Sequence, residues 1–543
     1  MTKISCSVKW NQPTMLMGDC VVPTNASVRY SDLRALAAHA EACFPESRFF
    51  LCTDGRMPYV TGAGLFRLCR RAAPVLEDTG DCRRIAILGP GSAAWLSAYF
   101  AVLSAGRVIV PLHDGLQQQE LEECIRAADC GILLCDERRG ETAAALARSF
   151  PDLRILELHA FIERLREQGE EFLPELGPDA VAAMYFTSGT MGKPRCVMLT
   201  HRNMGSQVSS ITEAIPLREE DTGLSLLPLS HTFEMMTYVA GALHCGGTLY
   251  LNESVRTVKK NLREKKPTIL VAVPLILQTL HKEILNTARK QGRLDRLQRA
   301  LRLNGKLQRS GFDMSRKLFG EVRELLGGRL DTIICGGAAL DAELIGFFRA
   351  LGIEVLQGYG ITECSPVVSV NRPGRNVIGS VGRPLSCCEV QIFDREICVR
   401  GDSVSPGYYK DPEATAESFR DGWFHTGDLG RMDRKGHLYF EGRIKNLIIL
   451  ANGENVSPEE LEEKLYQAEG ILDAVVYARD GKITAELFVD RALIPDVPAA
   501  WRIVSPINRT LASYKQIAEI VLRETEFEKT ATRKIKRYRI ERG

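Results

Sequence analysis

The chain has 543 residues, which is longer than one ordinary domain and favours two to four domains. Its hydrophobic fraction of 45% and charged fraction of 25% are typical of a globular protein. The net charge of +2 gives no overall preference for nucleic acid, so we expect no nucleic-acid partner.

The cysteines and the first residues bear on the compartment. Sixteen cysteines are scattered along the chain without a C-x-x-C pair. Because disulfide frameworks usually belong to small secreted domains, reduced thiols are expected. Residues 1–8 lack the charged-then-apolar pattern of a signal peptide, and no run approaches the roughly 20 apolar residues of a membrane span. We expect a cytoplasmic protein without a transmembrane segment, and contact with a membrane surface stays open.

The first strongly patterned region alternates short apolar strands with helices. Before it, residues up to about 81 show one helical pattern, over 30–43, and little functional signal. The pattern then predicts strands over 84–88, 108–111 and 131–135, and helices over 93–105 and 117–128. This alternation indicates a parallel sheet with helices on both faces.

A loop rich in hydroxyl groups and glycine follows a strand predicted over 181–186. It reads Thr187-Ser-Gly-Thr-Met-Gly-Lys-Pro194. Its glycines let backbone amides turn inward together, and such a nest suits phosphate. The loop is not a Walker A motif, because Pro194 stands where that motif has Ser or Thr. By itself, the pattern fits a polar hairpin loop better than a phosphate site.

A basic segment lies in the middle of the chain. Residues 281–330 contain 13 Lys or Arg against 5 Asp or Glu, mostly at helical spacing. Two interpretations stay open: a solvated helical face, or a surface for a lipid headgroup, the phosphates of CoA or an acidic carrier protein. Upstream, His231 stands between apolar stretches, where a hydrogen-bonded core histidine is usual.

Two more predicted strands run into glycine-rich turns. The strand over 331–335 enters 336–340, and the strand over 352–357 enters Gly358-Tyr-Gly-Ile-Thr-Glu363. Ligands of open parallel sheets bind at the carboxyl ends of strands, so these turns and the loop at 187–194 are expected to converge on one crevice. Tyr359 offers a face for stacking and Glu363 an oxygen ligand for Mg²⁺.

From about residue 377 the pattern changes to short alternating strands. Gly422-Trp-Phe-His-Thr-Gly-Asp428 is interpreted as a turn that carries a carboxylate. Ser457-Pro-Glu-Glu460 predicts a helix start with a capping box. The last hundred residues predict the order helix, strand, strand, helix, strand, and the basic tail at 529–537 would by itself be a disordered end.

Five of these segments resemble, in order, the motifs of the adenylate-forming superfamily: acyl-CoA synthetases, peptide adenylation domains and luciferases. Beside the loop at 187–194, they are the segment at 359–363, Thr426-Gly-Asp428, Gly442-Arg-Ile-Lys445 and the region of Lys534. The resemblance covers roughly residues 80–540. It implies an α/β adenylation domain of doubly wound sheets with a β-rich subdomain over 1–442, a hinge over 443–446 and a small mobile α+β domain over 447–543.

The resemblance also implies a reaction. A carboxylate attacks the α-phosphorus of ATP with Mg²⁺ present, and a thiol then displaces AMP. Catalysis is assigned to Lys534, Thr362 and Glu363, with Glu363 also the Mg²⁺ ligand. The acyl pocket is assigned to His231 and Phe233, the hinge to Lys445 and the thiol tunnel to Gly453. Contacts to ATP are assigned to Thr187, Ser188, Gly189, Thr190, Gly192, Lys193, Gly337, Ala338, Gly358, Tyr359, Gly360, Thr362, Asp428 and Arg443.

Within the superfamily, residues 227–234, 273–277 and 452–458 resemble the long-chain fatty acyl-CoA synthetases. We therefore expect a medium- or long-chain fatty acid as substrate and CoA as the acceptor. The segment between the domains lacks the insertion of the fatty acyl-AMP ligases, which favours thioester formation. The alternatives are a ligase that loads the phosphopantetheine of an acyl carrier protein, and a non-catalytic acyl or nucleotide sensor. The sensor has support only from Arg195 and Cys196, which replace a usual Lys and Gly and would put a Cβ on a turn.

Overall fold

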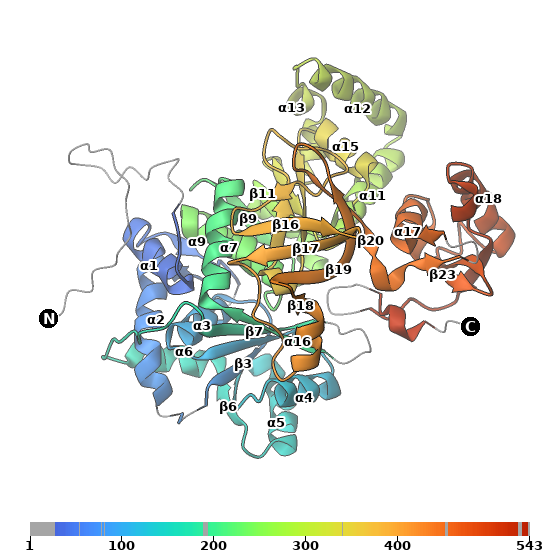
Figure 1. Cartoon of the computed structure of the whole chain (residues 1–543). Coiled ribbons are helices and arrows are strands. Elements are labelled where there is room, and N and C mark those ends of the chain that lie inside the picture. Colours follow the sequence, from blue (N-terminus) through green and yellow to red (C-terminus); the bar gives the residue numbers. More distant parts are fainter. Residues whose placement is uncertain are drawn as a thin grey trace.

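The computed structural model describes residues 28–53, 55–77, 79–80, 82–187, 194–338, 340–450, 454–529 and 535–540. Mixed sheets covered by helices form the larger part of the molecule, and a smaller unit of the C-terminal residues lies to one side (Figure 1). The predicted α/β class is confirmed. Among the described helices, none is long and apolar enough to cross a lipid bilayer.

The first sheet contains the alternating region predicted from the sequence. Its order is β6-β5-β3-β4-β7-β8, and all neighbours are parallel except β8, which is antiparallel to β7. The bounds are β3 (Arg84–Leu88), β4 (Val108–Leu112), β5 (Ile132–Cys135), β6 (Arg154–Glu157), β7 (Val181–Thr187) and β8 (Arg195–Thr200). β3, β4 and β5 are almost continuously apolar and buried, as strands covered on both faces must be.

Helices cover this sheet. They are α1 (Leu33–Cys43), α2 (Gly62–Glu77), α3 (Ala93–Ser104), α4 (Gln118–Ala127), α5 (Gly140–Ser149) and α6 (Leu158–Glu167). Every residue of α3 is buried. The side chain of Ser92 caps α3 by accepting a hydrogen bond from the Trp95 amide at 3.1 Å. The segment at 89–92 is therefore a strand-to-helix turn.

The second sheet has the order β10-β9-β11-β12-β13-β14-β15, parallel from β10 to β13 and antiparallel beyond. The bounds are β9 (Thr222–Ser225), β10 (Thr248–Leu251), β11 (Ile269–Ala272), β12 (Thr332–Cys335), β13 (Glu354–Gly360), β14 (Val367–Val370) and β15 (Arg383–Pro384). The turn predicted from residue 358 is wrong at its start, because β13 continues to Gly360 by pairing with β14. A Cβ at residue 360 would lie 2.2 Å from the Pro366 carbonyl oxygen, so this close pairing needs glycine.

The basic segment forms helices at the periphery of the second sheet. Figure 1 shows α12 and α13 at the outer edge of the molecule. Pro274 begins α11, where the amide that it lacks would have no partner within the helix. The helices of this half are α7 (His201–Ala214), α8 (Thr232–Glu234), a π-helical turn (Met235–Val239), α9 (Ala240–Cys245), α10 (Val258–Lys265), α11 (Pro274–Lys290), α12 (Leu294–Arg309), α13 (Ser315–Leu318), α14 (Gly320–Glu324) and α15 (Ala342–Ala350).

The third sheet is antiparallel and has the order β16-β17-β19-β18, with β20 also paired to β19. The bounds are β16 (Cys388–Phe393), β17 (Glu396–Gly401), β18 (Phe419–Arg420), β19 (Trp423–Met432) and β20 (Leu438–Arg443), with α16 (Pro412–Ser418) before β18. The turn predicted over 422–428 is wrong, because most of it belongs to β19. Gly427 at φ 70° and irregular register on both sides let this polar segment stay in the sheet.

The C-terminal unit follows the predicted order helix, strand, strand, helix, strand. Its elements are α17 (Pro458–Tyr466), β23 (Ile471–Arg479), β24 (Lys482–Val489), α18 (Val497–Asn508) and β25 (Glu519–Arg523). Buried apolar residues from Ile448 to Ile520 form its own core. We keep the hinge at 443–446 and the boundaries on either side of it as proposals.

Two local predictions for this unit need correction. Ser457 is the N-cap of α17, but no capping box forms: its hydroxyl donates to Glu459 at 2.8 Å, and Glu460 pairs with Lys515 at 2.7 Å. The described part of the basic tail is not a free end, because Lys529 pairs with Asp473 and Lys536 with Glu120 of α4. Buried or half-buried carboxylates thus pair with lysines of the tail that the sequence pattern alone would place in solvent.

Candidate active site

One cleft of about 3170 Å³ extends from the second and third sheets to the C-terminal unit. Residues from distant parts of the sequence line it together. The predicted site residues on its wall are Thr187, His231, Phe233, Gly337, Ala338, Gly358, Tyr359, Gly360, Thr362, Glu363, Asp428, Arg443 and Lys445. The expected convergence on one crevice is therefore observed for the described residues.

The other predicted site residues lie outside the described part of the chain. They are Ser188, Gly189, Thr190, Gly192, Lys193, Gly453 and Lys534. The roles assigned to them stay predictions. The ends of the phosphate-loop segment are described, and β7 and β8 bring Thr187 opposite Arg195.

A buried carboxylate, Asp428, lies where β19 and β20 pair. Its Oδ2 accepts a hydrogen bond from the Tyr359 hydroxyl at 2.7 Å, and its Oδ1 lies 3.1 Å from Nε of Arg443. Burial, and then the charge of Asp428, raise the pKa of Tyr359 far above its ordinary value, so Tyr359 stays a donor. Tyr359 and Arg443 thus orient the Asp428 carboxylate at the wall of the cleft.

The segment that carries Asp428 is held by Glu396, a residue that the sequence analysis did not select. Glu396 accepts the Gly427 amide at 2.8 Å, and its other oxygen lies 2.9 Å from Nδ1 of His425. Cys398 Sγ lies 3.4 Å from the same nitrogen. No sequence motif reveals these contacts, because the acid and the segment that it orients belong to different strands.

A second buried carboxylate, Glu363, lies just beyond β13. Its Oε1 accepts a hydrogen bond from the Tyr408 hydroxyl at 2.9 Å, and its Oε2 has no hydrogen-bond partner among the described residues. Burial raises the pKa of Glu363 above its usual range. A cation at Oε2 would offset the cost of burying this charge.

Arg195 and Cys196 occupy β8 next to this carboxylate. The Arg195 guanidinium lies 5.1 Å from the centre of the Tyr408 ring, a cation–π distance. The expectation that Cys196 places a Cβ on a turn is wrong, because Cys196 is a buried strand residue opposite Phe186. Burial raises its pKa to about 12, so it is an inert core thiol. The sensor alternative thus loses its structural support.

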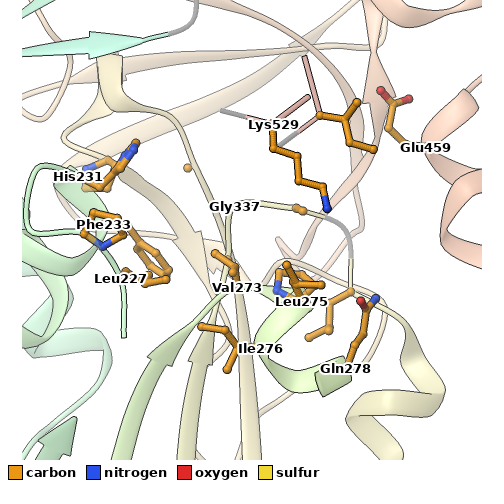
Figure 2. A pocket seen from close by; sticks show the side chains of 18 of the residues that line it. Leu227, His231, Phe233, Val273, Leu275, Ile276, Gln278, Gly337, Glu459 and Lys529 are labelled. Carbon is orange, nitrogen blue, oxygen red and sulfur yellow. The ribbon is translucent and has the colours of Figure 1, made fainter. Parts of the chain in front are cut away.

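The opposite wall of the cleft is mostly apolar. Figure 2 shows Leu227, His231, Phe233, Val273, Leu275 and Ile276 lining the pocket. A Cβ at Gly336 would lie 3.2 Å from the Phe233 ring, so this glycine keeps the strand end against the apolar wall. His231 is half-buried and lines the cleft, which differs from the fully buried core histidine that its surroundings favour.

A polar wall belongs to the C-terminal unit. Lys529 and Glu459 line the same pocket as the apolar residues (Figure 2). Lys529 Nζ lies 2.7 Å from Asp473 Oδ2, and Lys536 Nζ lies 3.2 Å from Glu120 Oε1. Both lysines therefore fix described parts of the C-terminal tail beside the cleft.

The fold and the cleft are those of a ligand-binding enzyme class: a large α/β body and a small α+β unit border one cleft that has buried carboxylates on one side and an apolar wall on the other. Residues 37–409 match the family model for AMP-binding enzymes, so this chain belongs to that family. The predicted superfamily is confirmed.

Similar proteins and structures support this membership. Long-chain-fatty-acid–CoA ligase 5 of Rattus norvegicus is 29% identical, over 76% of this chain and 67% of its own length. Fatty acyl-CoA synthetase A of Dictyostelium discoideum is 30% identical, over 82% and 74%. The structure of o-succinylbenzoate CoA synthetase of Bacillus subtilis with its acyl-adenylate intermediate has 25% identity and a TM-score of 0.75, and covers 93% of this chain and 97% of that one. The same enzyme has a structure with ATP and a magnesium ion, at a TM-score of 0.74.

Proposed function

We propose that this protein is an AMP-forming ligase that activates a long-chain fatty acid and transfers it to coenzyme A. The observation that carries the proposal is that Asp428, Glu363 and the apolar wall at Phe233 line one cleft. Such a cleft brings a nucleotide and an apolar acid together. The names of the related long-chain ligases support the choice of substrate.

The chemistry balances in two steps. A carboxylate oxygen attacks the α-phosphorus of ATP, the bond to pyrophosphate breaks, and an acyl-adenylate forms. A thiolate sulfur then attacks the acyl carbon, and the carbon–oxygen bond to AMP breaks. The first step brings two anions together, so it needs positive charge and hydrogen-bond donors around the phosphates.

We assign the nucleotide to the side of the cleft formed by β13 and β19. Asp428 would accept the ribose hydroxyls, since Tyr359 and Arg443 already fix its orientation. The ring of Tyr359 would lie against adenine, and Thr362 would contact the α-phosphate. Thr187 and the residues after it, through Lys193, would hold the outer phosphates.

The residues around Glu363 fit a magnesium ion. The free Oε2 is a hard oxygen ligand, and Tyr408 holds the other oxygen in place. When bound, the ion would neutralise charge on the triphosphate. Burial raises the pKa of Glu363 and so disfavours its carboxylate form. A bound cation would favour the carboxylate and oppose this shift.

The acyl chain and the catalytic lysine belong to the remaining walls. We assign the chain to the apolar wall at His231 and Phe233, and assign Lys534 to bridge the substrate carboxylate and the α-phosphate. After adenylation, rotation about the hinge near Lys445 would move Lys534 away and bring the loop at Gly453 to the thiol path.

Because the described cysteines are free thiols, we place the enzyme in the cytoplasm.

The test separates the two half-reactions. Pyrophosphate release is measured with ATP, Mg²⁺ and fatty acids of increasing chain length, and thioester formation is measured with CoA or with a phosphopantetheinylated carrier protein. We expect release with long-chain acids and transfer to CoA.

Asp428→Asn should lower kcat/KM for ATP by on the order of 100-fold, whereas Asp402→Asn, a control outside the cleft, should not. Failure of every acid to release pyrophosphate would refute the function, and transfer to the carrier protein alone would refute CoA as acceptor. Full adenylation by Lys534→Ala would refute only the assignment of that lysine.

A further inference from the structure

The outward face of α12 carries a row of basic side chains. Five exposed residues at spacings of three or four form this row, which we call the α12 face: Arg296, Arg299, Arg302, Lys306 and Arg309. The opposite side of α12 packs against the core of the second sheet through Leu297, with Leu301 beside it. The helix is therefore amphipathic: its apolar side packs on the core, and its cationic side is exposed.

The cations of the α12 face differ from their neighbours in how they are paired. None of its five cations forms an ion pair with a residue that the structure describes. Neighbouring cations do: Arg289 pairs with Glu469, Arg293 with Glu321 and Arg316 with Asp331. A cluster of unpaired cations on one helix face is an electrostatic site for an anionic partner.

Large apolar side chains are exposed within and beside this face. Leu303 lies between Arg299 and Lys306 on the helix and is 53% exposed, and Phe312 in the loop after α12 is 68% exposed. Met314 and Leu318, at 40% and 38%, continue the set into α13. Exposed apolar side chains grouped in this way are typical of a surface that binds a membrane or another molecule.

The loop after α12 is held in the conformation that exposes Phe312 and Met314. Between them, Oδ1 of the exposed Asp313 accepts hydrogen bonds from Nδ2 of Asn304 at 3.1 Å and from the Ser315 amide at 2.9 Å. Asn304 is fully buried, and its Oδ1 accepts the Met314 amide at 3.0 Å. The apolar tip is thus a fixed part of the fold.

We propose that the α12 face and the loop at 312–314 dock this protein on anionic lipid bilayers. The cations would lie at the phosphate level, and Phe312, Met314 and Leu303 would enter the interface, the arrangement of an interfacial amphipathic helix. An acidic protein could match the same cations, whereas a bilayer offers anionic headgroups with an apolar layer directly beneath them, which suits cations beside an apolar tip. Figure 1 shows α12 and α13 at the outer edge of the molecule. This inference goes beyond the proposed function, and its assay needs no turnover.

Vesicle co-sedimentation of the full chain tests the docking. Vesicles of phosphatidylcholine alone are compared with vesicles of phosphatidylcholine mixed with phosphatidylserine, at low and at high salt. We expect binding only to the mixed vesicles, weakened by salt. The triple variant Arg299→Gln/Arg302→Gln/Lys306→Gln should lower the partition coefficient by on the order of 100-fold. A matched variant, Lys482→Gln/Arg502→Gln/Arg509→Gln, removes the same charge from exposed positions of the C-terminal unit and should bind like the parent.

A second pair of variants tests the apolar tip. Phe312→Ser/Met314→Ser should lose most vesicle binding while keeping binding to heparin, a soluble polyanion. Phe172→Ser, which removes an exposed aromatic ring elsewhere, is the control. Equal binding to both vesicle types, or full vesicle binding by either α12-side variant, would overturn the proposal. Retention of a soluble acidic protein by the parent, without vesicle binding, would assign the surface to a protein partner instead.

Discussion

At the scale of single residues, the environment of Glu363 determines how the site should respond to pH. The carboxylate is buried, its pKa is raised, and Tyr408 donates its one described side-chain hydrogen bond. Only the ionised form can hold a cation. Activity should therefore be present above the raised pKa and be lost as the pH falls through it.

Tyr408→Phe should move the acid limb of the pH–rate profile to higher pH by roughly one unit. The change removes the hydrogen bond that favours the carboxylate, so the pKa of Glu363 rises further. The measurement is pyrophosphate release against pH at several Mg²⁺ concentrations. Tyr409→Phe, whose hydroxyl bonds to Asp129 instead, is the control and should leave the limb in place. An unchanged acid limb in Tyr408→Phe would show that Glu363 does not control this step.

At the scale of elements, β9 packs closely against the π-helical turn. Tyr238 of this turn is buried, and its hydroxyl reaches the Thr248 carbonyl of β10 at 3.4 Å. A Cβ at Gly223 of β9 would lie 2.2 Å from the Tyr238 ring. The ring fills space that only glycine leaves open, so the turn and the strand must fit each other.

Gly223→Ala should lower the free energy of unfolding by roughly 1–3 kcal/mol, because the added methyl group forces the buried ring to move. Gly305→Ala is the matched control: nothing lies within 4 Å of its Cβ, and it sits inside α12. There the same substitution should stabilise by about 0.5–1 kcal/mol through helix propensity. Thermal unfolding midpoints of both variants measure the contrast. Equal shifts of the same sign would contradict the packing argument.

At the scale of the whole molecule, weak contacts join the small unit to the body. The pairs Lys536–Glu120 and Arg289–Glu469 cross between them, both partly exposed to solvent. Pairs of this kind contribute about 1 kcal/mol at most. Such weak pairs fit the proposal that the small unit changes its position between the two half-reactions.

Lys445→Pro should separate the two half-reactions. Proline would fix φ at residue 445, which is exposed and which we propose as the hinge, so we expect rotation to be blocked while the resting arrangement persists. Pyrophosphate release should stay within about twofold, whereas thioester formation should fall by more than about tenfold. Lys445→Ala removes the same charge without fixing φ and should keep both activities. Equal loss of both half-reactions in Lys445→Pro would contradict a hinge at this position.

Motifs and periodicity along the chain were enough to predict the chemical groups of the site and the order of the elements. Periodicity predicted β3, β4, β5 and the C-terminal series, because burial on one or both faces leaves a regular trace along the chain. The motif at 359–363, with Asp428, indicated a nucleotide site through its resemblance to the motifs of the adenylate-forming superfamily. These inferences depend on neighbours in sequence or on motif order, and both are visible before folding.

Which groups contact one another became visible only in the folded chain. Asp428 bonds to Tyr359 and Glu363 bonds to Tyr408, in each case far away in the sequence. Glu396 holds the segment that carries Asp428 from another strand. Strand pairing also converted two predicted turns into parts of β13 and β19 and placed Cys196 in a core. Such contacts join residues separated by tens to hundreds of positions, so no local pattern encodes them. Their energies come from burial and pairing that exist only once the sheets have formed.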